Sequence, residues 1–178
     1  DISDLGFLRR NDAKGMRYSY ERSSSKHPGF KSVFSQVIAN VEYNLDGQRV
    51  DNMLTAWQEF RFHNNHFIFY QLSYMPERWD DKNSDGNGDF RIDDRWQTWL
   101  QWGNSRAAKM NVKAKYVYTD EDIGGSDHQY ELQLTWRPID QLGVELRTRY
   151  NDRDGWLLHS GGGDFTTYEA EVWAPQLR

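Results

Sequence analysis

Apolar and polar residues alternate with a period of two through most of the second half of the chain. Between residues 108 and 118, every even position carries Ala, Met, Val or Tyr, while the odd positions begin with lysine and asparagine. Successive side chains of a β-strand point to opposite faces, so this pattern predicts a strand with one apolar and one polar face. The same division predicts strands at 96–102, 129–136, 144–150 and 167–174.

The first half of the chain is also rich in aromatic and β-branched residues, although Trp57, Phe67 and Phe69 interrupt the alternation. Strands are expected there at 16–24, 32–44, 52–63 and 65–75. We also expect residues 1–9 to pair as a strand. The chain is thus predicted to be all-β, with about nine or ten antiparallel strands and almost no helix.

Charges on the predicted polar faces change sign from one strand to the next. Facing side chains on neighbouring strands interact directly, so this order favours an up-and-down meander in which each strand pairs with the next. The residues expected on the polar face are Lys113, Glu131, Arg147 and Glu169. Those expected on the apolar face are Val112, Leu132, Leu146 and Ala170.

The connections between predicted strands alternate in length. Short ones are expected at 63–65, 103–106 and 137–141, and long ones at 76–93, 119–127 and 151–164. Bacterial outer-membrane barrels have short periplasmic turns and longer external loops, and aromatic girdles at both membrane interfaces. Aromatic residues recur near both ends of the predicted apolar faces, at Phe62, Trp102 and Trp136 on one side and at Tyr74, Trp96, Tyr118, Tyr130, Tyr150 and Tyr168 on the other. We therefore expect one domain over residues 1–178, an outer-membrane-type β-barrel or a portion of one.

The composition restricts the alternatives. The net charge of -5 is mild and its signs are interleaved, which argues against a nucleic-acid surface. Cysteine is absent, which excludes disulfides and thiolate metal sites. No apolar run reaches the roughly twenty residues of a spanning helix. A soluble barrel of the lipocalin kind would show the same period and stays open as the alternative fold.

Two segments carry a family resemblance. Residues 4–12 read DLGFLRRND and precede a strand with Tyr18 and Tyr20, and residues 75–81 read MPERWDD. These segments resemble the barrel region of largely uncharacterised bacterial outer-membrane proteins that carry an N-terminal carbohydrate-binding module of the family-nine type. The resemblance implies an outer-membrane location and contact with lipid. Because the chain lacks that module and is short for the whole barrel, further strands are expected from the rest of the chain or from another chain.

The loop after the second of these segments has the spacing of a calcium loop. Residues 81–89 read DKNSDGNGD, with oxygen-bearing side chains at alternate positions around glycines. An EF-hand would need flanking helices and a glutamate at the twelfth position, where this chain has Ile92. The candidate ligands are Asp81, Asn83, Asp85, Asn87, Asp89 and Asp93. A solvated loop without metal is the alternative interpretation.

Tryptophans provide candidate platforms for sugar rings. Trp96 and Trp102 belong to the predicted apolar face, where girdle packing explains them, whereas Trp99 belongs to the polar face. With Lys113, Glu131 and Arg147 on that face, Trp99 completes the candidate ligand-binding set. No catalytic residue is assigned. The function expected is glycan binding or passage at the cell surface, with a soluble ligand-binding barrel second and a carbohydrate-active hydrolase third.

Overall fold

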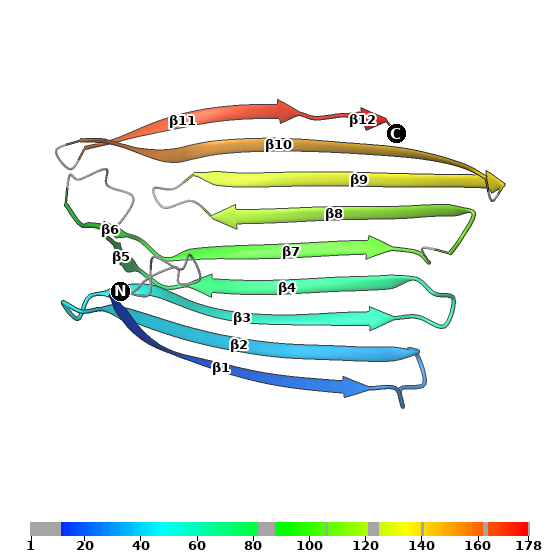
Figure 1. Ribbon diagram of the computed structural model, residues 1–178, viewed down its shortest axis with the longest axis horizontal. Coiled ribbons are helices and arrows are strands. Elements are labelled where there is room, and N and C mark those ends of the chain that lie inside the picture. Colours follow the sequence, from blue (N-terminus) through cyan, green and yellow to red (C-terminus); the bar gives the residue numbers. More distant parts are fainter. Residues whose placement is uncertain are drawn as a thin grey trace.

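The protein is a long antiparallel β-meander (Figure 1). The computed structural model describes residues 12–81, 88–105, 107–120, 125–139, 141–161 and 164–177, without the side chains of 155–161, 164–170 and 177. Its strands are β1 (Ala13–Ser24), β2 (Ser32–Asn44), β3 (Arg49–Arg61), β4 (Phe67–Met75), β5 (Arg78–Asp80), β6 (Phe90–Ile92), β7 (Arg95–Gly103), β8 (Met110–Asp120), β9 (Ser126–Ile139), β10 (Leu142–Gly161), β11 (Asp164–Trp173) and β12 (Gln176–Leu177). Across these described ranges, no helix is long and apolar enough to cross a membrane.

Nine strands of the main sheet follow one another in sequence order, from β1 to β4 and from β7 to β11. The short β5 and β6 form a separate two-stranded hairpin between β4 and β7, and β12 pairs with β10. The expected all-β up-and-down meander is confirmed. The strand expected at residues 1–9 lies outside the described residues.

The register divides the sheet into two faces. Tyr116 of β8 stands opposite Tyr130 of β9, which stands opposite Tyr150 of β10. One position along, Lys115, Glu131 and Arg149 form the neighbouring rung. Paired residues in a sheet share a face, so we call the first set part of the apolar face and the second set part of the polar face. The polar face includes Lys113, Glu131 and Arg147, and the apolar face includes Val112, Leu132 and Leu146, as expected.

Strand β11 departs from the prediction. Its register pairs Val172 with Asn151 of the polar face and Trp173 with Tyr150 of the apolar face, where the two rings lie 4.8 Å apart. Ala170 pairs with Arg153 of the polar face, so the placement expected for Ala170 was wrong, whereas the side chain of Glu169 lies outside the described part of the chain. A slip of one residue exchanges the two faces of a strand, and the phase found here puts the large Trp173 indole against Tyr150.

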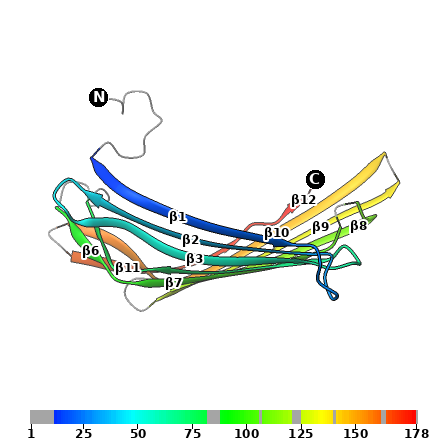
Figure 2. The same cartoon turned by 90° about the horizontal axis from the view of Figure 1, so that it is seen from below.

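The meander does not close into a barrel. Among the described strands, β1 pairs only with β2, and β11 only with β10, which leaves a hydrogen-bonding edge at each side of the sheet. Closure requires the last strand to pair with the first, so of the two expectations, a barrel or a portion of one, the described strands do not form a closed barrel. The sheet is nevertheless twisted and curved. Figure 2 shows that the start of β1 and the start of β10 rise toward the viewer of Figure 1. The polar face is the concave one.

Connections at the two ends of the sheet differ. We call the end with connections 25–31, 62–66, 104–109 and 140–141 the turn end, and the opposite one the hairpin end. The long connection expected at 76–93 is present and contains β5 and β6. The long loop expected at 151–164 was wrong, because β10 continues to Gly161 and β11 begins at Asp164. The polar composition of this segment predicted a loop. Cross-strand hydrogen bonds satisfy its backbone N–H and C=O groups and hold it as strand.

Candidate functional site

Four aromatic side chains form a row on the polar face. Phe34 of β2 stacks on Trp57 of β3 at a centroid distance of 4.8 Å, Trp57 lies 5.3 Å from Phe69 of β4, and Phe69 lies 5.1 Å from Trp99 of β7. Phe34 and Phe69 occupy one rung of the sheet and Trp57 and Trp99 the next, so the contacts run diagonally between strands. All four side chains are half-buried. We call these residues the aromatic row.

Only one member of this row was predicted from the sequence. Trp99 lies on the polar face as expected, whereas Phe34, Trp57 and Phe69 were missed. The signal was present in the sequence, because Trp57 and Phe69 are residues that interrupt the alternation of the first half. An aromatic side chain at a position where a polar residue is expected indicates that aromatic rings pack on that part of the polar face.

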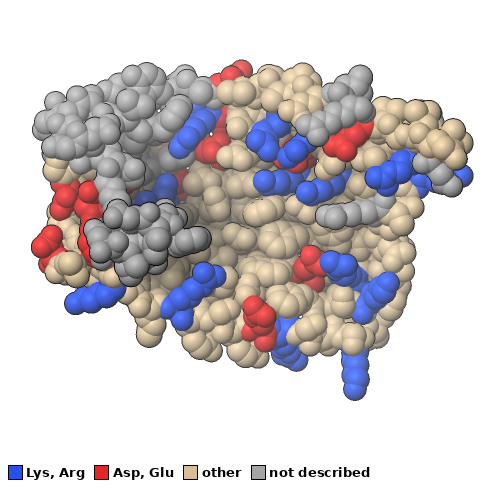
Figure 3. Space-filling view, in the orientation of Figure 1, with Lys and Arg blue, Asp and Glu red and all other residues tan. Residues whose placement is uncertain are grey.

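Four cations lie beside the aromatic row. The Lys115 ammonium stands over the Trp99 ring, 4.6 Å from its centroid, at the distance of a cation–π contact. Lys115 belongs to the rung with Glu131 and Arg149, and the adjacent rung holds Lys113, Gln133 and Arg147. We call Lys113, Lys115, Arg147 and Arg149 the cationic cluster. Lys and Arg side chains gather over β8 to β10 on the face shown in Figure 3.

Glu131 is the centre of this cluster. Its Oε1 lies 3.0 Å from the Arg147 guanidinium and its Oε2 lies 3.1 Å from that of Arg149. The Glu131 side chain is 8% exposed, whereas those of the two arginines are 42% and 47% exposed. One buried carboxylate therefore orients two arginines that stay half-exposed on the polar face.

The predicted ligand-binding set is partly assembled. Glu131 and Arg147 form an ion pair, and Trp99 lies at the end of the aromatic row nearest to them. Lys113 shares their face, but the lysine that contacts Trp99 is Lys115. The sequence alone did not indicate which of the two lysines contacts Trp99, because both are at odd positions of β8.

Buried polar atoms of the polar face include three without a hydrogen-bond partner within the part of the chain that the structure describes. They are Nε1 of Trp99, Oδ1 of Asn151 and Oδ1 of Asp127. Trp99 and Asn151 belong to one rung, three strands apart, and Asp127 belongs to the next rung. A buried polar atom without a partner costs free energy, and its burial also keeps it out of reach of a ligand in this conformation.

The polar face is hollowed at the turn end. A cleft of about 830 Å³ lies between the connections 62–66 and 104–109. Its lining includes Lys31, Arg61, His66, Gln101 and Lys113. Lys113 lines this cleft and is also a member of the cationic cluster. The cleft and the cluster therefore form one continuous surface.

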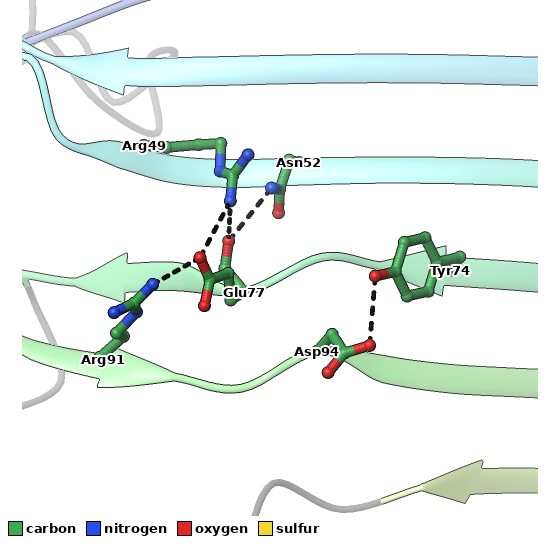
Figure 4. Close-up of polar contacts among 6 residues, drawn as sticks. All are labelled: Arg49, Asn52, Tyr74, Glu77, Arg91 and Asp94. Carbon is green, nitrogen blue, oxygen red and sulfur yellow. Dashed lines mark hydrogen bonds and ion pairs between the residues drawn. The ribbon is translucent and has the colours of Figure 1, made fainter.

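The hairpin of β5 and β6 is fastened to β3 at the opposite end (Figure 4). The Arg49 guanidinium donates to the Glu77 carbonyl at 2.8 Å, and the Asn52 amide donates to the same oxygen at 3.3 Å. Arg91 pairs with the Glu77 carboxylate, and the Tyr74 hydroxyl donates to Asp94 at 3.1 Å. These contacts hold the base of the connection 76–94 against the sheet.

The structure describes only part of the predicted calcium site. Asp81 accepts a hydrogen bond from Asn44 at 3.3 Å, and Asp89 and Asp93 are exposed. Gly88 has a φ of 89°, a conformation that glycine adopts without strain. Asn83, Asp85 and Asn87 lie outside the described residues. Among the residues that are described, no group of three or more metal-ligating side chains is found.

Aromatic side chains also line both ends of the apolar face. Toward the hairpin end, Tyr74 contacts Trp96 at 4.6 Å, and a chain of ring contacts joins the four further strands β8 to β11. This chain joins Tyr116, Tyr130, Tyr150 and Trp173, with centroid distances of 5.0, 6.1 and 4.8 Å. Toward the turn end, Trp102 contacts His66 at 5.6 Å, and Trp136 pairs with Met110.

No protein-family model, curated protein or solved structure matches the chain. The functional interpretation therefore depends on the chemistry of the two faces. One is an exposed apolar surface bordered by aromatic rings, and the other is a concave polar surface crossed by an aromatic row and a cationic cluster.

Proposed function

We propose that this chain forms part of the wall of a bacterial outer-membrane β-barrel, with its apolar face against lipid and its polar face lining the interior. The observation that carries the proposal is the distribution of exposure. Thr55, Ser73, Thr119, Asp127 and Glu131 of the polar face are at most 9% exposed. The exposed apolar-face residues include Met16, Tyr18, Tyr20, Leu54, Trp96, Leu100, Trp102, Tyr130, Leu132 and Trp136, at 39% to 72%. Water would oppose such an arrangement, and a bilayer would stabilise it.

Strand length and aromatic placement support the same proposal. β4 and β7 have 9 residues and β8 has 11, the lengths that cross a bilayer when strands are tilted. Trp96 and Trp102 stand six positions apart on β7, about 20 Å along the strand. Tryptophan and tyrosine favour the membrane interface, where the ring is partly buried and the polar atom reaches water.

The soluble alternative fits the curvature less well. A lipocalin-type barrel encloses an apolar ligand cavity and exposes a polar outer surface. Here the concave face carries the charges and the convex face carries the large apolar side chains. The sign of the curvature therefore favours the membrane barrel over the soluble ligand-binding barrel.

The barrel requires more strands than the structure describes. Each of the strands β1 and β11 offers one unpaired edge, and unpaired edges are not tolerated in the hydrocarbon region of a bilayer. We propose that further barrel strands, from elsewhere in a longer chain or from another chain, pair with these edges. The surrounding partner of the closed wall is outer-membrane lipid.

For the interior we propose glycan binding or passage at the cell surface. Aromatic rings on a polar surface present apolar faces to sugar rings, while neighbouring polar groups hold hydroxyls. This role also agrees with the resemblance of residues 4–12 and 75–81 to proteins that carry a carbohydrate-binding module. A hydrolase is the weaker alternative, since both oxygens of the buried Glu131 are engaged by arginines and are poorly placed for acid–base chemistry.

A matched pair of variants tests the membrane proposal. Leu132→Arg places a charge on the apolar face between Tyr130 and Trp136, and Gln129→Arg places the same charge three residues away on the polar face, beside Asp127. An arginine that faces lipid near the midplane destabilises the barrel by about 2–4 kcal/mol. We expect Leu132→Arg to reduce the fraction of the completed barrel that folds into phospholipid vesicles, measured by flotation, and Gln129→Arg to leave it near the unaltered value. Equal behaviour of the two variants would contradict the proposal.

A further inference from the structure

We propose that the polar face binds an acidic oligosaccharide, with sugar rings on the aromatic row and sugar carboxylates at the cationic cluster. This inference rests on the proposed glycan function and names its ligand class. It starts from the continuity of the two features, which meet where the Lys115 ammonium stands over Trp99. The surface from Phe34 to Arg149 crosses seven neighbouring strands, a span of about 29 Å.

The aromatic row has an orientation that suits an extended ligand. Its rings come from β2, β3, β4 and β7, so the row runs across the strands. The Trp57 indole donates to Oε1 of Gln36 at 2.7 Å, which fixes the plane of the ring at the middle of the row. Phe34 and Trp57 stack on each other and Lys115 covers one face of Trp99, so an oligosaccharide lying along the row would place its C–H groups on the ring edges and the remaining free faces.

The cationic cluster has more positive charge than its own carboxylate can neutralise. The rungs Lys115–Glu131–Arg149 and Lys113–Gln133–Arg147 contain four cations and one carboxylate. This excess is local, since the whole chain has a net charge of -5. Arginines that are held at one side by Glu131 and half-exposed at the other can bind a second carboxylate with paired hydrogen bonds.

The junction of the two features distinguishes a sugar acid from a simple anion. A small inorganic anion could occupy the cationic cluster, but it has no apolar surface to place on the aromatic row. A uronic acid carries a carboxylate and C–H groups on one ring, which matches the half-exposed arginines and the row that meets them at Lys115 and Trp99.

The test uses the chain together with the further strands that complete its barrel, folded in detergent micelles or vesicles, with oligogalacturonate as the acidic probe. The same oligomer with methyl-esterified carboxylates serves as the neutral probe, so that the two ligands share one sugar backbone and differ in the charge and the methyl group of each carboxyl. Binding is measured by calorimetry and by the change in tryptophan fluorescence. We expect the acidic oligomer to bind at least about tenfold more tightly than the ester, and added salt to weaken only the acidic one.

Variants separate the two parts of the surface. Arg149→Gln should weaken the acidic oligomer about tenfold and leave the ester unchanged, whereas Trp57→Ala should weaken both. Trp57→Phe keeps an aromatic ring and should retain most of the binding, which separates stacking from loss of folding. Trp96→Ala, on the apolar face, is the matched control and should bind like the unaltered chain.

Three results would overturn the inference in distinguishable ways. Equal affinity for the acid and its ester would remove the acidic specificity and leave the glycan function standing. Absence of binding to either oligomer by protein that still inserts into vesicles would remove the glycan function and leave the membrane wall. Failure of the unaltered chain to insert into vesicles even together with the strands that complete its barrel would remove the proposed function itself.

Discussion

Gly103 shows how closely the polar face is packed at a single residue. A Cβ at this position would lie 2.7 Å from Cε1 of Phe67 and 3.1 Å from the backbone oxygen of Val112. Neither group can retreat easily, because Phe67 pairs with Gly103 and Val112 belongs to the adjacent strand. The absence of a side chain at the end of β7 therefore allows Phe67 to cover this rung.

The expected effect of Gly103→Ala is a loss of stability of about 1–3 kcal/mol, the usual cost of overpacking. Gly143→Ala is the matched control, since its Cβ would meet only Cγ of Arg137 at an ordinary 3.8 Å. The measurement is the free energy of unfolding by urea in the same vesicles or micelles. If both variants lost equal stability, the close approach of Phe67 to Gly103 would be the wrong explanation.

Individual site residues could be predicted only as far as their face. The odd numbering of Trp99, Glu131 and Arg147 placed them on the polar side, and the structure agrees. Whether Lys115 or Lys113 contacts Trp99 depends on the register between β7 and β8. Alternation within one strand does not determine that register. The same limit explains why the diagonal contacts of Phe34, Trp57 and Phe69 were missed.

At the scale of the element, β11 illustrates what alternation leaves undetermined. Its expected apolar positions include the small Ala170 and Ala174. The two possible assignments of its residues to the faces of the sheet therefore differ little in free energy. The register places Trp173 against Tyr150 instead, and bulges in β10 near Arg153 and near His159 accommodate the change. An aromatic contact between strands has thus outweighed a weak pattern within one strand.

The connection between β5 and β6 carries the calcium prediction. We propose that carboxylates in residues 81–93 bind calcium weakly, because several like charges on a short turn repel one another unless a cation screens them. In a calorimetric titration, Asp89→Asn should weaken calcium binding, and Glu21→Gln, near the turn end of β1, should not. If the unaltered chain released no heat at millimolar calcium, the metal would be excluded and the connection would be a solvated hairpin.

At the scale of the whole molecule, strand number and order were predictable and closure was not. Period-two alternation and charge order describe each strand and its immediate neighbour, which together specify a meander. Closure depends on whether the first and last strands meet, a property of the summed curvature and of any additional strands. The open edges of β1 and β11 are therefore a finding of the structure.

The measurement that tests the central claim most directly uses the natural absence of cysteine. Single cysteines placed along β9 at positions 129, 130, 132, 133 and 134 would carry a fluorophore, in vesicles containing a lipid-attached quencher. We expect strong quenching at Tyr130, Leu132 and Leu134 on the apolar face and weak quenching at Gln129 and Gln133 on the polar face. Stronger quenching at Gln129 and Gln133, or equal quenching at all five positions, would contradict the assignment of the apolar face to lipid.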